Sequence, residues 1–275
     1  MAKIIAITNQ KGGVGKTTTS VNLAASLAAT KRRVLLIDLD PQGNATMGSG
    51  VDKRALTTSV YDVLVEERDI ASAVVPAGQA GFSLLPANDD LTGAELSLLD
   101  LPQREQRLKR ALDAAQHDYD YILIDCPPSL NMLTLNALVA AEAVLIPMQC
   151  EYFALEGLSA LVRTIDKIRN TLNPKLQLAG VLRTMFDPRN NLANDVSAQL
   201  VAHFGDRVYR TVIPRNVRVA EAPSHGLPVL LYDKTSRGAQ AYLALAGEIL
   251  RRTDQGQTAP KAPAGAVYQP EDQPV

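Results

Sequence analysis

Short apolar runs alternate with longer stretches of helical spacing along most of the chain. The apolar runs predict β-strands, because they are short and lie between clusters of polar residues, glycine and proline. Their near-continuous apolar character is typical of parallel strands that helices cover on both faces. The predicted strands are Lys3–Thr8, Arg33–Asp38, Tyr121–Asp125, Ala143–Pro147, Gln177–Leu182 and Thr211–Ile213.

Between these strands, apolar residues recur at the spacing of amphipathic helices. The predicted helices are Lys16–Ala29, Arg104–Gln116, Ser129–Ala140, Leu155–Asn170, Asn194–His203 and Arg237–Arg251. The alternation predicts an α/β fold, with a doubly wound, mostly parallel sheet flanked by helices. The stretch from Gly43 to Asp100 is less regular, and we expect short helices there with a small strand near Phe82–Leu85.

The pattern predicts a single domain over residues 1–252. From Thr253 onward the chain is rich in Gln, Pro, Ala and Gly, which predicts a disordered tail over residues 253–275. Prolines recur in this segment and no apolar face is present, so it does not predict a membrane-binding amphipathic helix.

Composition and charge narrow the functional classes. Aromatic residues make up 4% of the chain and Trp is absent, which argues against binding single strands by base stacking. The net charge is −1, so affinity for DNA or a membrane surface must come from a local patch. Cys126 and Cys150 lack companion ligands and are expected to be buried thiols. There is no signal-peptide pattern and no apolar run of about 18 residues, so we expect a cytoplasmic protein.

A glycine-rich segment between the first strand and the first helix predicts a phosphate site. Glycine permits positive φ values, and a helix N-terminus directs N–H groups at an anion. In such a loop Lys16 reaches the β- and γ-phosphates and Thr17 coordinates Mg²⁺. The predicted nucleotide-binding residues are Lys11, Gly12, Gly13, Val14, Gly15, Lys16, Thr17 and Thr18. The loop departs from the usual pattern, since Gln10 occupies the first glycine position and Lys11 adds a second lysine. These residues predict a P-loop NTPase.

Three aspartates follow predicted strands. Asp38 and Asp40 come after the second strand, and Asp125 ends the strand Tyr121–Asp125. Ligands gather at the carboxyl edge of parallel sheets, and hydrolysis needs groups that orient water and hold Mg²⁺. Asp125 fits the role of contacting Mg²⁺ through water.

Several motifs together resemble the ParA/Soj partitioning ATPases, in the ParA/MinD group with a deviant Walker A loop. The similarity runs through residues 7–19, 35–44, 122–129, 214–218, 221–226 and 232–233. This resemblance implies that Lys11 reaches across a homodimer interface to the partner's nucleotide. It also implies that Asp40 positions the attacking water and that Asp38 supports the magnesium end, which gives Lys11, Lys16 and Asp40 as the catalytic set.

The base specificity follows partly from the residues and partly from the resemblance. No Asn-Lys-x-Asp run, the usual guanine-reading element, occurs in the chain. The predicted cofactors are therefore ATP and Mg²⁺. By resemblance, the adenine packs beside Pro214 and Asn216.

A local basic patch is the candidate DNA-binding surface. Residues 205–237 hold six Lys and Arg residues against three acidic ones. Such clustering suits sequence-independent contacts with phosphates. The resemblance implies non-specific binding of double-stranded DNA by the ATP-bound dimer, and hence association with the nucleoid. The candidate DNA-binding residues are Arg189, Arg215, Arg218, Lys234 and Arg237.

These features favour an ATP-dependent DNA-segregation ATPase. A ParB-type centromere-binding partner would stimulate its hydrolysis, which we expect to be slow alone. The alternative is a MinD-like positioning ATPase on a membrane, against which the proline-rich tail argues. Two further functional classes remain open. One is a reductase of the nitrogenase iron-protein type, which needs cluster-binding cysteines. The other is a metabolic kinase, although the sequence indicates no pocket for a phosphate acceptor.

Overall fold

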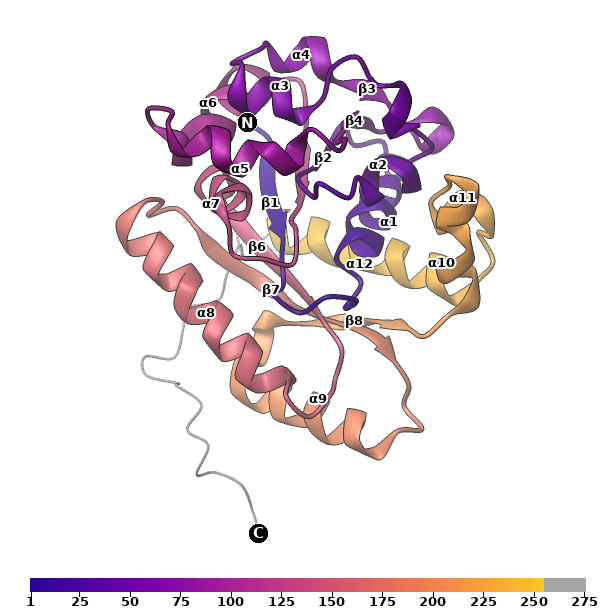
Figure 1. The fold of residues 1–275 in the computed structure, drawn as a ribbon. Coiled ribbons are helices and arrows are strands. Elements are labelled where there is room, and N and C mark those ends of the chain that lie inside the picture. The colour runs from indigo at the N-terminus through magenta and orange to yellow at the C-terminus, as the bar shows by residue number, and fades with distance from the viewer. Residues whose placement is uncertain (255–275) are drawn as a thin grey trace.

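The computed structural model describes residues 1–254, which contain one eight-stranded sheet (Figure 1). The strand order is β3-β4-β2-β5-β1-β6-β7-β8. Every neighbouring pair is parallel except β3 with β4. The strands are β1 Lys3–Ile7, β2 Val34–Asp38, β3 Val75–Pro76, β4 Ser83–Leu85, β5 Tyr121–Asp125, β6 Ala143–Met148, β7 Gln177–Phe186 and β8 Val208–Pro214.

Twelve α-helices and several single 3₁₀ turns connect the strands of the described chain. The helices are α1 Lys16–Ala29, α2 Asn44–Gly48, α3 Val60–Val65, α4 Ile70–Ala73, α5 Leu91–Leu99, α6 Arg107–Ala115, α7 Met132–Ala140, α8 Ala154–Thr171, α9 Asn191–Phe204, α10 Val217–Glu221, α11 Val229–Tyr232 and α12 Arg237–Asp254. Among the residues described, no helix combines the length and apolar character needed to cross a membrane.

Helices cover both faces of the sheet and form two separate apolar cores (Figure 1). On one face α1 and α12 pack against the strands, through residues such as Leu23, Leu27 and Leu245. On the other face α7, α8 and α9 pack, together with α3 to α6. Both faces of the central strands are therefore buried, which explains why β2 and β5 are apolar at nearly every position.

The structure confirms the predicted α/β class and the main strands and helices. β7 and β8 are longer than predicted, since they continue to Phe186 and Pro214. The segment from Gly43 to Asp100 does form short helices and a small strand, but the antiparallel edge strand β3 was not predicted. α12 includes Thr253 and Asp254, so the predicted tail is wrong for these two residues. Its remainder, residues 255–275, lies outside the described residues.

The sheet brings the predicted site residues to one edge. β1 lies between β5 and β6, and β5 also pairs with β2. The registers place Asp125 beside both Ile7 and Asp38. Because these strands are parallel, the loop after β1 and the aspartates of β2 and β5 share one carboxyl edge.

Candidate nucleotide-binding site

The loop between β1 and α1 has the backbone of a phosphate cradle. Gly13 and Gly15 adopt φ values of 72° and 85°, in the left-handed region that favours glycine. Gly15 is the N-cap of α1, and no side chain caps this end. The first N–H groups of α1 are therefore left for an anion. The strand, loop and helix stand as the sequence predicted.

Asn9 attaches the start of this loop to the neighbouring strand. Its side-chain oxygen accepts a hydrogen bond from the Lys11 backbone N–H at 3.0 Å, and its amide donates to the Pro147 carbonyl of β6 at 2.8 Å. Sequence reasoning did not select Asn9, although it directly precedes Gln10 in the motif. Its role depends on β6, which is distant in sequence.

Lys16 lies inside the loop. It is buried, and its Nζ donates to the Lys11 carbonyl at 3.2 Å. Burial lowers the pKa of its ammonium, and the nearby charges of Asp125 and Asp40 partly oppose this effect. A bound polyphosphate would supply negative charge to this partly desolvated cation, as its predicted role requires.

Lys11 is directed away from the loop interior. Its Nζ forms an ion pair with the Glu151 carboxylate, which follows β6, and both side chains are about half exposed to solvent. The two lysines of the motif therefore differ, because Lys16 is enclosed while Lys11 is at the rim. No sequence motif links Glu151 to the loop, so this ion pair could not be predicted from the sequence.

Asp125 is fully buried beneath the loop. Its Oδ1 accepts a hydrogen bond from the Ser20 hydroxyl at 2.7 Å. Burial and the neighbouring charge of Asp38 raise the pKa of Asp125 to about 8, although the hydroxyls of Ser20 and Thr17 oppose the shift. Its Oδ2 has no hydrogen-bond partner among the described residues. A buried oxygen of this kind needs a partner.

The residues around Asp125 fit a magnesium ion. Carboxylate and hydroxyl oxygens are the donors that Mg²⁺ uses together with waters and substrate phosphates. Thr17 and Asp125 lie close enough for the hydroxyl to lower the pKa of the carboxyl, and the open Oδ2 can accept from a metal-bound water. A bound Mg²⁺ would neutralise charge on the terminal phosphates. Thr17 and Asp125 would hold it, and Asp38, the register partner of Asp125 on β2, stays a predicted support of the magnesium end.

Asp38 and Asp40 differ in their surroundings. Asp38 is fully buried, and it accepts hydrogen bonds from the Thr46 N–H and hydroxyl, both at 2.8 Å, and from the Asp40 N–H at 3.1 Å. Burial raises its pKa to about 6 despite these bonds. Asp40 is partly exposed, and its carboxylate accepts from the Gln42 N–H at 3.0 Å. Their separate roles stay predictions, but Asp38 also holds the start of α2 in place.

The predicted base-binding residues lie at the end of β8. Pro214 closes this strand, and Asn216 caps α10 by accepting from the Val219 N–H at 3.2 Å. Asn22 of α1 accepts from the Val229 N–H at 2.7 Å and so connects α11 to the helix that follows the phosphate loop. Contact of Pro214 and Asn216 with adenine stays a prediction.

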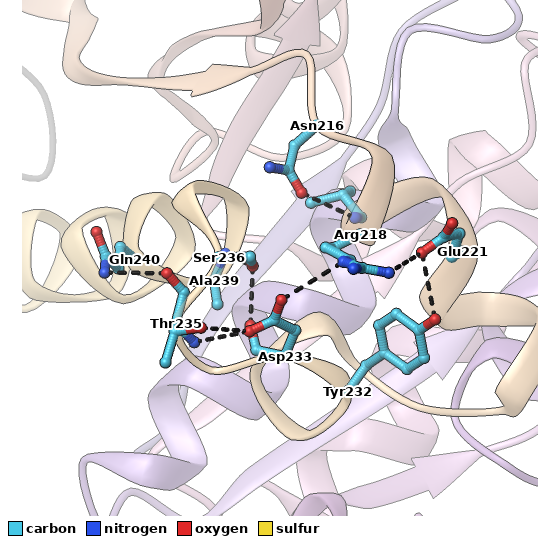
Figure 2. Close-up of polar contacts among 10 residues, drawn as sticks. Asn216, Arg218, Glu221, Tyr232, Asp233, Thr235, Ser236, Ala239 and Gln240 are labelled. Carbon is cyan, nitrogen blue, oxygen red and sulfur yellow. Dashed lines mark hydrogen bonds and ion pairs between the residues drawn. The ribbon is translucent and has the colours of Figure 1, made fainter.

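The predicted DNA-binding residues are all exposed, but two of them have acidic partners. Arg189 forms a bidentate pair with Asp187, at 2.7 and 2.9 Å. Figure 2 shows Arg218 between Glu221, at 2.9 Å, and Asp233, at 3.5 Å.

The fold brings part of this basic set together. Arg215 lines a small cavity of about 160 Å³ together with Asp187 and Asn190, which lie on either side of Arg189 in the sequence. Arg237 begins α12 and Lys234 lies three residues before it, and α12 contacts both α10 and α11.

The cysteines behave as buried thiols. Both are free, and burial raises the pKa of Cys150 to about 11 and that of Cys126 further. No group of three or more His, Cys, Asp or Glu residues in the described chain could hold a metal ion.

Comparison with known proteins agrees with this site. A family model described as an AAA domain matches residues 2–178. Soj of Bacillus subtilis, a sporulation initiation inhibitor protein, is 55% identical over 90% of this chain and 98% of its own. The chromosome partitioning protein ParA of Caulobacter vibrioides is 54% identical over 91% of this chain and 94% of its own.

Solved structures resemble the whole fold. A Mycobacterium smegmatis protein described as cobyrinic acid a,c-diamide synthase, with bound ADP and magnesium, is 41% identical with a TM-score of 0.82. That match covers 95% of this chain and 99% of the other. MinD of Pyrococcus horikoshii with Mg-ADP is 26% identical with a TM-score of 0.76, over 95% of this chain and 100% of the other.

The fold and the loop define a P-loop ATPase that uses ATP and Mg²⁺. The chain belongs to the ParA/Soj family of chromosome-partitioning ATPases.

Proposed function

We propose that ATP switches this ATPase between a monomer and a DNA-binding dimer. In the ATP-bound state two copies enclose two nucleotides between them, and this dimer binds double-stranded DNA without sequence preference. Hydrolysis, stimulated by a ParB-type centromere-binding partner, returns the protein to monomers. The cycle would place the active form on the nucleoid.

The position of Lys11 is the observation that carries this proposal. Its ammonium lies at the rim of the site, half exposed and paired with Glu151, while Lys16 already occupies the loop interior. An exposed ammonium group at that rim can bind a phosphate group that its own loop does not hold. A second copy facing the same edge would present such a phosphate, and Lys11 would exchange Glu151 for it.

Exposed basic residues supply the proposed DNA contact. Arg215, Lys234 and Arg237 have exposed side chains, and Arg189 and Arg218 add to them. Arg215 lines the same small cavity as Glu151, the ion-pair partner of Lys11. Contacts of this kind bind phosphates and carry no base readout. Phosphate oxygens would compete with Asp187 for Arg189, and with Glu221 and Asp233 for Arg218.

The roles of the remaining site residues follow the chemistry of hydrolysis. Asp40 is the partly exposed carboxylate at the edge and would position the attacking water, while Asp38 and Asp125 form the magnesium end. Pro214 and Asn216 would flank the adenine. We expect slow turnover by the protein alone, with a rise when both DNA and the partner are present.

The test compares DNA retention of the wild type with that of Lys11→Ala. Wild-type protein should remain on unrelated duplex DNA with ATP and dissociate with ADP, and sedimentation should show a dimer only with ATP. K11A should bind Mg-ADP normally but stay monomeric and off DNA. Equal retention with ATP and ADP would contradict the switch. Flotation with liposomes addresses the MinD-like alternative, which requires nucleotide-dependent binding to lipid.

A further inference from the structure

A residue of β7, far from the P-loop in sequence, holds one peptide of the loop. The hydroxyl of Thr184 donates a hydrogen bond to the Val14 carbonyl at 2.8 Å. Both residues are almost fully buried, with exposures of 2% and 1%. The Thr184 side chain also packs about 3.9 Å from the position that a Cβ on Gly15 would take. Thr184 lies in none of the sequence motifs of the site.

The bonded peptide adjoins a flexible position. Its orientation depends on ψ of Val14 and on φ of Gly15, and Gly15 has a positive φ of 85°. Glycine accepts either sign of φ at little cost, so the loop itself restrains the orientation of the Val14–Gly15 peptide only weakly. Something outside the loop must therefore determine which way its carbonyl points.

The orientation of that peptide decides whether the loop attracts or repels phosphate. In a trans peptide the C=O and the following N–H point in opposite directions. With the Val14 carbonyl bound to Thr184 in the interior, the Gly15 N–H is directed to the other side, where the cradle needs donors. A reversed peptide would instead present a carbonyl oxygen to the phosphates.

The backbone of β7 departs from regular geometry where it meets the loop. Its register against β8 shifts between Arg183 and Phe186, and within that interval Met185 has φ 49°. A left-handed methionine is an uncommon and strained conformation. Bulges near active sites redirect side chains, and this one adjoins the residue that contacts the loop.

We propose that Thr184 is a positioning residue for the ATPase reaction. It keeps the Val14–Gly15 peptide in the orientation that binds phosphate, although it does not contact the nucleotide itself. Replacing Thr184 should weaken nucleotide binding, and the loss of the hydroxyl alone should account for the weakening. The proposal does not depend on dimer formation or on DNA.

The test compares two substitutions that separate the hydroxyl from packing. Thr184→Val keeps the shape and removes the donor, while Thr184→Ser keeps the donor and removes a methyl group. We expect Mg-ADP to bind T184V about tenfold more weakly, the effect of one lost hydrogen bond. T184S should bind within about twofold of the wild type. Titration calorimetry at one pH measures both.

Controls distinguish positioning from a general loss of structure. Thr164→Val removes a hydroxyl that bonds only within α8, to the Ala160 carbonyl, and should leave Mg-ADP affinity unchanged. Thermal melting without nucleotide shows that each variant is folded, and Thr184→Ala serves if T184V does not fold. Wild-type affinity in folded T184V, or equal losses in T184V and T184S, would overturn the proposal.

Discussion

Burial sets the protonation of the carboxylates in the site. Asp125 and Asp38 lie side by side on β5 and β2, both without solvent exposure. Burial disfavours the charged form of Asp125 and the neighbouring charge of Asp38 adds to this effect, so the pKa of Asp125 rises to about 8. Asp40, two residues after Asp38, differs from both in being partly exposed. The three aspartates are thus chemically distinct, although the sequence presents them as equivalent strand ends.

The raised pKa of Asp125 predicts that Mg-ADP affinity depends on pH. Holding Mg²⁺ requires the carboxylate, so metal binding must release the proton that the empty site retains below about pH 8. Affinity should therefore increase from pH 6 to pH 8, by up to about tenfold per pH unit, and be constant above. Calorimetry across this range in buffers of different ionisation enthalpy measures both affinity and proton release. ADP with a chelator in place of Mg²⁺ should show a much weaker dependence, and a flat Mg-ADP profile would contradict the assignment.

At the scale of elements, a side chain of α12 accepts hydrogen bonds from the edge strand of the sheet. β8 is the last strand, so its outer N–H groups lack a neighbouring strand. Glu248 of α12 accepts hydrogen bonds from the N–H groups of Arg210 and Thr211, both at 2.9 Å, and from the Thr211 hydroxyl at 2.8 Å. Arg252 pairs with the same carboxylate at 2.7 Å. One side chain thereby fastens the last helix to the last strand.

Glu248→Ala should lower the free energy of unfolding by about 2–3 kcal/mol, because it leaves two partly buried backbone N–H groups without their acceptor and Arg252 without its carboxylate. Urea unfolding of the nucleotide-free protein measures the change. Gln240→Ala, at an exposed position on the same helix, is the matched control and should change stability by less than about 0.5 kcal/mol. Equal stability of the two variants would show that α12 does not depend on this contact.

At the scale of the whole molecule, electrostatic attraction to DNA must come from a local group of basic residues. The net charge is −1, so the proposed DNA binding depends on a few exposed basic residues and not on the overall field. These residues come from four places in the sequence: the loop after β7, the end of β8, α10 and the start of α12. They share the half of the molecule formed by β7, β8 and the final helices (Figure 1).

Arg237→Ala should weaken the binding of unrelated duplex DNA in the presence of ATP. It should also make the affinity for DNA depend less on salt concentration. Loss of one phosphate contact reduces the slope of log affinity against log salt by about 1. Fluorescence anisotropy at several salt concentrations measures this slope. Arg169→Ala removes a cation of α8 that pairs with Asp166, and it should leave the slope unchanged. An unaltered slope in R237A would remove Arg237 from the interface.

The sequence by itself determined the α/β class, the phosphate loop and the family, because these depend on local spacing. A P-loop is a strand, a glycine-rich turn and a helix start in continuous order, so Lys11 to Thr18 could be recognised without the fold. The tertiary structure alone revealed the residues that support the loop from elsewhere: Asn9 through Pro147, Glu151 against Lys11, and Thr184 on Val14. Their roles arise from the pairing of distant parallel strands, and no spacing in the sequence encodes which strands become neighbours. The same reason applies to the unpredicted edge strand β3, which is two residues long and exists only because β4 lies beside it.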